Sequence, residues 1–363
     1  MQTAAARDRL APEDGRMVRA VWFDAGPETP GRLLLMIHHL VVDGVSWRVL
    51  LPDLAAAWAD VAAGRPATIP PVGLSFRRWS ELLGERAADP AREDELPLWT
   101  SALTGADPLP LPRPLDPAKD VVSTTGYLSL TLPAERTAPL LTRVPARFGA
   151  TVNDVLLTAL ALAVADWRRR RGGTGTSVLV DLEGHGREEE LAGDADLSRT
   201  VGWFTSVVPV RLDTGQADLD DAFAGGPAVD AVLAGVREHL ASLPVAGMGH
   251  GLLRHLNAAT GPELARFGDP DVEFNYMGRF GHPEAADWSY APEEDAADLD
   301  ADPGMPLSHA LTVNAMTEDR ADGPRLAAHW SYAADLLSEH DVRDLATTWF
   351  RALTALVNRA ARA

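Results

Sequence analysis

The sequence contains no cysteine among its 363 residues. Disulfide bonds, cysteine-ligated zinc and a thiol nucleophile are therefore excluded, and a reducing compartment is expected. Long apolar runs are also missing, because no stretch approaches the roughly 18 apolar residues that a membrane-spanning helix requires. Residues 1–16 mix acidic and basic side chains without the apolar segment of a secretion signal. We expect a cytoplasmic protein that is neither secreted nor inserted into a membrane.

Positive charge is scarce, since 33 basic residues face 52 acidic ones and the net charge is −19. A nucleic-acid partner bound through its phosphates is therefore disfavoured. The acidic residues of segment 292–303 repel one another and predict a solvated loop. Hydrophobic residues make up 46% of the chain, which is enough for a sizeable core and for two lobes.

The N-terminal part begins with two predicted strands, 18–23 and 33–42, which are joined by a Gly/Pro turn. Residues 33–37 are all apolar and predict a buried strand. Apolar residues then recur at helical spacing from Trp47 to Val61, and Gly64 ends the predicted helix. Pro52 lies inside this pattern and is expected to kink the helix or to mark its first turn.

The sequence His-His-Leu-Val-Val-Asp-Gly occupies positions 38–44. Because side chains alternate along a strand, we expect His38 and His39 to point to opposite faces. Asp43 and Gly44 supply a carboxylate and a permissive backbone at the following turn. Taken alone, adjacent histidines are more often one core and one surface residue than a functional pair.

Segment 108–117 contains five prolines and predicts a stiff connector, where we place the boundary between lobes 1–115 and 116–363. After it come a predicted strand, 127–132, and a capping box at Thr151 and Asp154 that begins a long helix, 155–171. The four arginines 168–171 suit the C-terminal end of this helix better than a docking role. Strands then alternate with helices, which indicates α/β layers.

Three further segments combine glycine turns with polar side chains. Residues 183–188 read Glu-Gly-His-Gly-Arg-Glu and follow a β-branched run, so Glu183 is expected where a strand opens into a loop. Residues 199–205 read Arg-Thr-Val-Gly-Trp-Phe-Thr, and residues 274–278 read Phe-Asn-Tyr-Met-Gly. Each segment alone is compatible with a strand that ends in a glycine turn.

Together, the four segments resemble the HHxxxDG, EGHGRE, RTVGWFT and FNYLG motifs of epimerization domains of nonribosomal peptide synthetases, which belong to the condensation-domain superfamily. Ordinary condensation domains do not normally carry EGHGRE. The resemblance implies two chloramphenicol-acetyltransferase-like lobes that form a V around an active-site tunnel, with mixed sheets and flanking helices. Only 37 residues precede His38, fewer than family members carry, so the N-terminal lobe is expected to be incomplete.

The implied activity is cofactor-independent epimerization, from L to D, at the α-carbon of an aminoacyl or peptidyl thioester. The substrate would arrive on the phosphopantetheine arm of a peptidyl carrier protein, and neighbouring synthetase modules would be further partners. The reaction removes a proton from one face of the carbon and returns one to the other, which needs an acid/base on each side. His39 and Glu183 are the candidates, and burial is expected to raise the pKa of Glu183.

Other residues are expected to support the site. Asn275 and Tyr276 would position the substrate or donate to the enolate oxygen, or would simply end a strand. Asp43 is expected to fix its loop by pairing with an arginine rather than to touch the substrate. The remaining supporting candidates are His38 and His185, while Trp203 is expected to form a wall of the tunnel or core.

Two other chemistries fail on motif grounds. A hydrolase elbow G-x-S-x-G is not formed around Ser46, because Arg48 replaces the second glycine. No HExxH or comparable zinc spacing occurs, so no metal is predicted. Two alternatives stay open: a condensation or acyltransferase domain, in which His39 assists attack of an amine on a thioester, and a catalytically silent docking module.

Overall fold

The computed structural model describes residues 2–193, 195–281, 288, 291 and 302–362. The chain forms two compact units. The first unit comprises Met1–Leu83, His185–Thr205 and Pro283–Ala301, and the second comprises Gly84–Gly184, Ser206–His282 and Asp302–Ala363. These bounds differ from the lobes 1–115 and 116–363, whose division stays a prediction. Residues 292–301 of the acidic segment lie outside the described residues.

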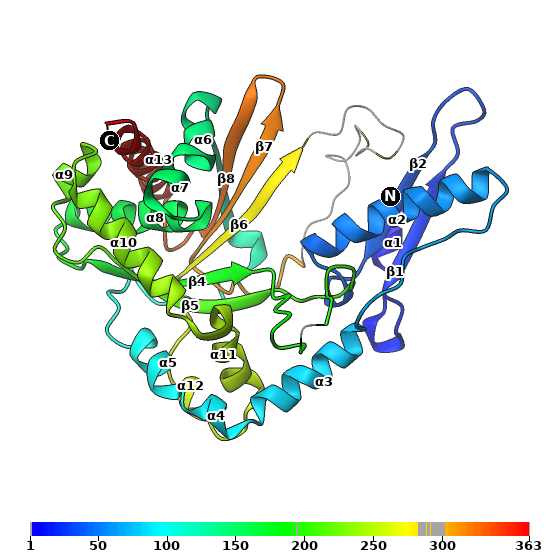
Figure 1. The fold of residues 1–363 in the computed structure, drawn as a ribbon, viewed down its shortest axis with the longest axis horizontal. Coiled ribbons are helices and arrows are strands. Elements are labelled where there is room, and N and C mark those ends of the chain that lie inside the picture. The colour runs from blue at the N-terminus through cyan, green and yellow to red at the C-terminus, as the bar shows by residue number, and fades with distance from the viewer. Residues whose placement is uncertain (1, 194, 282–287, 289–290, 292–301, 363) are drawn as a thin grey trace. The chain divides into compact units, whose positions relative to one another are not determined.

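The second unit is built on a six-stranded mixed sheet with the strand order β3-β8-β7-β6-β4-β5 (Figure 1). The β4–β6 and β6–β7 pairs are parallel, and the other pairs are antiparallel. The strands are β3 (Thr125–Leu132), β4 (Ser177–Gly184), β5 (Ser206–Asp213), β6 (Val272–Gly281), β7 (Leu311–Arg320) and β8 (Gly323–Ala333). With its flanking helices, this sheet confirms the predicted mixed α/β fold.

One face of the sheet carries the core of the second unit, because alternate strand residues point to it. Phe274, Val313 and Trp330 are almost completely buried there. Helices α8 (Val152–Arg169), α10 (Ala228–Ala241) and α13 (Glu339–Arg362) lie on this side of the unit (Figure 1). Trp349 of α13 is fully buried, and its indole N–H donates to the Leu156 carbonyl at 3.1 Å.

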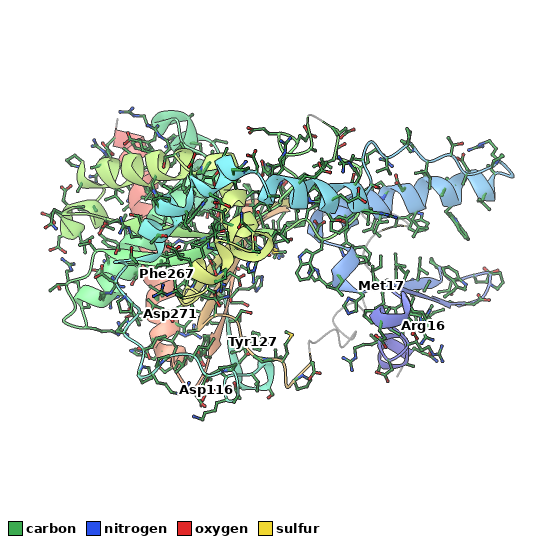
Figure 2. The ribbon with its side chains drawn as sticks, turned by 90° about the horizontal axis from the view of Figure 1, so that it is seen from below. Arg16, Met17, Asp116, Tyr127, Phe267 and Asp271 are labelled. Carbon is green, nitrogen blue, oxygen red and sulfur yellow. The ribbon has the colours of Figure 1, made fainter. Side chains whose placement is uncertain are left out.

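The opposite face of the sheet is polar, because the intervening positions of its central strands carry polar side chains. From β4 to β7, these are Asp181, Glu183, Glu273, Asn275, Thr312 and Asn314. At the edge of the sheet, Tyr127 of β3 is 70% exposed (Figure 2). This alternation places several carboxylates on one face, opposite the apolar core.

Helix α8 begins with the predicted capping box, in which Thr151 and Asp154 exchange hydrogen bonds. The arginines at its end are structural, as predicted. Arg168 donates to four backbone carbonyls. Arg169, Arg170 and Arg171 form ion pairs with aspartates of their own unit, which are Asp166, Asp220, Asp341 and Asp344.

Shorter helices complete the second unit. They are α4 (Pro90–Glu93), α5 (Leu96–Leu103), α6 (Ala134–Leu141), α7 (Arg143–Phe148), α9 (Leu219–Phe223), α11 (Met248–Gly251) and α12 (Gly261–Leu264). A π-helical turn, Leu252–Leu256, follows α11, and 3₁₀ turns lie at Val122–Thr124 and Pro244–Gly247. Helix α3 (Phe76–Ala87) runs across the boundary between the two units.

The first unit contains the antiparallel strands β1 (Val18–Phe23) and β2 (Arg32–Ile37), the helices α1 (Gln2–Arg7) and α2 (Gly44–Ala62), and 3₁₀ turns at Pro12–Asp14 and His39–Val41. The predicted strand 33–42 is too long, because the chain turns at His39. The prediction that residues 33–37 form a buried strand was also wrong. Leu33 is 40% exposed, because β1 and β2 pair only with each other within the described residues. Helix α2 starts at Gly44, so Pro52 lies in its interior rather than in its first turn.

Within the described part of the chain, no single helix has the length and apolar composition to cross a membrane. The segments Ala134–Phe148 and Val152–Arg169 meet those criteria only as a pair, and that pair is bent by 97°.

Candidate functional site

In the first unit, the predicted site residue Asp43 caps the N-terminus of α2 and is only 4% exposed. Its Oδ1 accepts hydrogen bonds from the Ser46 backbone N–H and from the Ser46 hydroxyl, both at 2.7 Å. Its Oδ2 accepts a third bond, from the backbone N–H of Phe204, at 3.1 Å. A carboxylate at this position satisfies amide groups that a helix leaves unpaired at its start.

Arg187 completes this network with a bidentate ion pair to Asp43, at 2.8 and 3.0 Å. Its guanidinium also donates to the Thr200 carbonyl and lies 4.2 Å from the centre of the Phe204 ring. Burial alone would raise the pKa of Asp43, but the hydrogen bonds from Arg187, Ser46 and Phe204 outweigh burial and lower it. The expected pairing of Asp43 with an arginine is confirmed, and the pair joins three motifs. We call this group the Asp43 cluster.

The paired histidines lie at the turn between β2 and α2. His38 is half-buried, and its Nδ1 accepts a hydrogen bond from the Leu40 backbone at 3.2 Å. His39 is exposed, with its ring centre 4.7 Å from that of Trp203, which is 44% exposed. The alternation argument for His38 and His39 does not hold, because β2 ends at Ile37. His185 is exposed and accepts a hydrogen bond from the Arg187 backbone.

In the second unit, Glu183 lies near the end of β4 on the polar face of the sheet. Burial and the negative charge of Glu273 raise the pKa of Glu183 to about 7, while the charge of His309 and a hydrogen bond from the Asn275 side chain act in the opposite direction. The predicted effect of burial is therefore confirmed. The contribution of Glu273 was not foreseen, because it depends on the pairing of β4 with β6.

The FNYMG segment lies on β6, where Asn275 and Tyr276 point to opposite faces. Asn275 reaches Glu183, whereas the Tyr276 ring packs against the core and its hydroxyl lies 2.9 Å from the Thr317 hydroxyl. The register of β6 with β7 shifts just after Tyr276, where Gly278 adopts a positive φ of 89°. Such a bulge redirects the side chains beside it. The catalytic roles of Asn275 and Tyr276 stay predictions.

Sequence reasoning missed His309, which precedes β7. Its Nε2 lies 2.8 Å from Asp181 Oδ2, and its Nδ1 lies 3.6 Å from Glu273 Oε2. The Thr312 hydroxyl donates to the same Glu273 oxygen at 3.0 Å. We call Asp181, Glu183, Glu273 and His309 the Glu183 cluster. The i, i+2 acidic pair of β4 signals a polar sheet face, but no sequence signal places His309 there.

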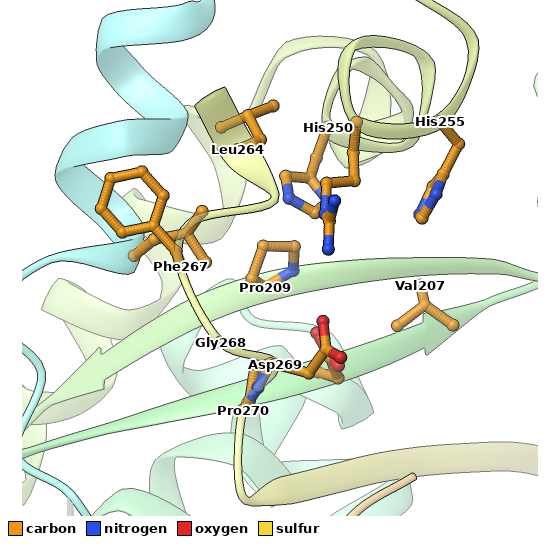
Figure 3. A pocket seen from close by; sticks show the side chains of 12 residues that line it. Val207, Pro209, His250, His255, Leu264, Phe267, Gly268, Asp269 and Pro270 are labelled. Atoms are coloured by element: carbon orange, nitrogen blue, oxygen red, sulfur yellow. The ribbon is translucent and has the colours of Figure 1, made fainter. Parts of the chain in front are cut away.

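A small cavity of about 80 Å³ lies beside this cluster in the second unit, with Asp181 in its wall (Figure 3). His250 also lines it, and burial together with the charges of His255 and Arg254 lowers the pKa of His250 to about 4. The loop that leads into β6 forms another wall, with Phe267 and Asp269. In Figure 2, Phe267 and Asp271 mark this loop. Among the described residues, no group of three or more histidines and acids is arranged to hold a metal ion.

The two leading candidates belong to different units, since His39 lies in the first and Glu183 in the second. Their approach to a common carbon atom therefore stays a prediction. The structure does bring Asn275 to Glu183 within the second unit, and it brings Asp43 to Arg187 within the first.

A family model described as Condensation domain matches residues 5–362. The chain is 36% identical over 347 residues to a linear gramicidin synthase of Brevibacillus parabrevis, and 38% identical over 348 residues to a chondramide synthase of Chondromyces crocatus. These alignments cover 95% and 94% of this chain, but the chain spans only 4% and 8% of the relatives' length.

Among solved structures, the epimerization domain from the third module of tyrocidine synthetase B is similar, with a TM-score of 0.83 and 29% identity over all of this chain and 76% of that one. The X-domain from teicoplanin biosynthesis has a TM-score of 0.61 and 23% identity, covering 95% of this chain and 72% of that one. The second likeness concerns the fold alone.

Proposed function

The chain belongs to the condensation-domain family, and from this premise we propose that it epimerizes the α-carbon of an aminoacyl or peptidyl thioester from L to D. The observation that carries the proposal is the environment of Glu183, a sheet-face carboxylate whose pKa is about 7. The EGHGRE segment and the likeness to a tyrocidine synthetase epimerization domain support the same activity.

Glu183 suits this chemistry because a carboxylate that titrates near neutral pH both accepts and donates a proton readily. In the proposed reaction, one base removes the α-proton, and the electron pair of the broken C–H bond moves into the thioester carbonyl to give an enolate. A proton then returns to the opposite face of the carbon. We assign the two faces to Glu183 and His39, and we assign the support of the enolate oxygen to Asn275 or Tyr276.

The Asp43 cluster has a positioning role in this proposal. Asp43 holds both the start of α2 and the backbone of Phe204, which follows Trp203 in the chain. Trp203 in turn contacts the ring of His39. The buried ion pair with Arg187 thus fixes the turn that carries His39, without a direct part in proton transfer. His38 and His185 bond to backbone N–H groups in the same unit and would shape the loops around the site.

We further propose that the substrate arrives on the phosphopantetheine arm of a peptidyl carrier protein, with neighbouring synthetase modules as additional partners. The linear gramicidin and chondramide synthases that match this chain support this assignment. The reaction transfers only protons, so it requires no intrinsic metal or redox cofactor. A condensation activity is the second candidate, because the matching family model is described as a condensation domain.

The decisive experiment supplies an L-aminoacyl or peptidyl carrier protein in deuterated water. We expect the α-position to gain deuterium and the product to drift toward an L/D mixture, as measured by mass spectrometry and chiral chromatography after thioester hydrolysis. Glu183→Gln should slow this exchange by at least about a hundredfold, and His39→Ala should also slow it. The exposed Glu190 is a matched control, and Glu190→Gln should leave exchange unchanged.

Three outcomes would contradict the proposal. Undiminished exchange in Glu183→Gln would remove Glu183 from the mechanism. Amide formation with an added amine acceptor, without α-proton exchange, would favour the condensation alternative. Carrier binding with neither reaction would identify a catalytically silent docking module.

A further inference from the structure

His309 lies between carboxylates from two neighbouring strands, and the strand register explains why. The parallel pairing of β4 with β6 sets Asp181 beside Glu273, and the parallel pairing of β6 with β7 sets Glu273 beside Thr312. His309 lies just before the start of β7, close to Asp181 and Glu273. Its side chain is only 8% exposed, and its two ring nitrogens lie 2.8 Å from Asp181 and 3.6 Å from Glu273.

This geometry favours the doubly protonated ring. The ring hydrogen-bonds to Asp181 through Nε2, and Nδ1 lies 3.6 Å from Glu273, which is too far for a hydrogen bond but close enough for its negative charge to favour a proton on the ring. Burial alone would lower the pKa of His309, but the hydrogen bond with Asp181 and the charge of Glu273 outweigh burial and raise it. Asp269, on the loop before β6, adds negative charge in the same direction.

The charge of His309 affects the ionisation of Glu183, because Glu183 interacts electrostatically with both Glu273 and His309. With His309 charged, the charges of Asp181, Glu273 and His309 sum to −1; with a neutral ring they sum to −2. More negative charge near a carboxylate disfavours its ionisation, so the loss of the imidazolium would make Glu183 hold its proton more tightly. Half-buried Asp271 on the adjoining loop interacts with His309 as well and belongs to the same electrostatic group.

We propose that His309 is a positioning residue for Glu183. Held as an imidazolium by its hydrogen bond with Asp181 and by the nearby charge of Glu273, it offsets their negative charge and sets the pH range in which Glu183 exchanges protons. The proposal rests on the function proposed above for Glu183. It assigns His309 no contact with the substrate. Its effect is transmitted through charge across two adjacent strands of one unit.

The direct test is a titration of Glu183 in the whole protein. Glutamate labelled with ¹³C at the side-chain carboxyl reports ionisation by NMR, and the Glu183 signal is identified by its loss in Glu183→Gln. We expect His309→Asn to shift the Glu183 midpoint upward by roughly one pH unit. Glu273→Gln should shift the midpoint downward. The variant removes a negative charge that acts on Glu183 and also one of the charges that favour the imidazolium, and the direct effect of Glu273 on Glu183 is larger than that of His309.

The matched control is His329→Asn. His329 lies on β8 and bonds to Ser129 at 2.8 Å, and β7 separates β8 from β6 in the sheet. This variant should leave the Glu183 midpoint unchanged. A Glu183 midpoint that stays within about 0.2 units of the wild-type value in folded His309→Asn would overturn the proposal. If that variant does not fold, the ¹⁵N chemical shifts of the His309 ring in the wild-type protein decide the question, because a neutral His309 ring at pH 7 overturns the proposal equally.

A second readout is the pH profile of carrier-dependent deuterium exchange. The acidic limb should move upward in His309→Asn and downward in Glu273→Gln, whereas a merely structural defect would reduce the rate at every pH without moving the limb. If the wild-type protein shows no exchange, the proposed function fails. The NMR titration still decides separately whether His309 controls Glu183.

Discussion

The two units of the molecule are stabilised in different ways. In the second unit, apolar residues of α8 and α13 pack against a six-stranded sheet, and Phe274, Trp330 and Trp349 are almost completely buried. In the first unit, the best-connected buried group is the ion pair of Asp43 with Arg187. Its fully buried large side chains are few among the described residues, and Trp79 and Phe204 pack next to that pair. The first unit therefore depends on directional polar contacts, while the second has a distributed apolar core.

The same contrast separates the two candidate carboxylates. Asp43 accepts hydrogen bonds from Arg187, Ser46 and Phe204, so its charge is compensated and its pKa is lowered. Glu183 lies beside another carboxylate, Glu273, and its pKa is raised. A compensated carboxylate is a fixed structural charge, whereas a carboxylate that titrates near pH 7 is suited to proton transfer. Local charge balance thus distinguishes the structural carboxylate, Asp43, from the carboxylate that we propose to be reactive, Glu183.

The largest expected effect on stability comes from Arg187→Met. This change leaves the charge of Asp43 buried without its ionic partner, which typically costs about 3–5 kcal/mol. We expect the loss to be concentrated in the first unit. Hydrogen exchange measured by mass spectrometry shows in which unit the amides lose protection, because peptides from α2 and from α8 report the two units separately.

Arg199→Met provides the control for that prediction. Arg199 also pairs with an aspartate of the first unit, Asp53, at 2.7 Å, but the two side chains are 27% and 21% exposed. Pairs with access to water contribute less than about 1 kcal/mol. If both variants lost the same small amount of protection, the Asp43 cluster would not be the main stabilising contact of the first unit.

A smaller but more widespread effect is expected from Leu160→Ala in the second unit. Leu160 of α8 is fully buried, so its truncation leaves a cavity and should cost about 3 kcal/mol. Because the core is continuous, peptides from the sheet should lose protection together with peptides from α8. Leu98→Ala is the control, since Leu98 is 37% exposed and should change stability far less. Loss confined to α8 would contradict a distributed core.

Local sequence patterns predicted the elements whose determinants are local. The bounds of β1 and the capping box at Thr151 and Asp154 agree with the prediction, because alternation and capping involve residues only a few positions apart. The strand through the histidines was extended too far. Its apolar run continues to Val42, but the backbone turns at His39, where Leu40 bonds back to His38.

The two clusters were beyond such reasoning because their contacts depend on tertiary register. Arg187 is 144 residues from Asp43 in the sequence, and His309 is 128 residues from Asp181. The motif resemblance selected Asp43 and Glu183 as candidate residues, and burial correctly predicted the direction of the Glu183 pKa shift. The identity of the neighbouring charges became visible only when strands β4, β6 and β7 were aligned.

The smallest expected effect concerns pH, and its sign differs between the units. The folded pKa of Glu183, about 7, lies above its ordinary value of 4.5, so the unfolded chain releases this proton first as pH rises. Glu183 should therefore reduce the stability of the second unit progressively between about pH 4.5 and pH 7, by about 1–3 kcal/mol in total. Glu183→Gln should recover this amount at pH 8 and nothing at pH 4.

Asp43, whose pKa is lowered from 3.8, should act oppositely, and the first unit should lose stability as pH falls through the acidic range. Hydrogen exchange followed from about pH 2 to pH 8, corrected for the intrinsic rates, measures both slopes, because the Asp43 effect falls below pH 3.8 and the Glu183 effect falls between pH 4.5 and pH 7. A second unit whose stability is as independent of pH in the wild type as in Glu183→Gln would show that Glu183 is not held in its unfavourable environment.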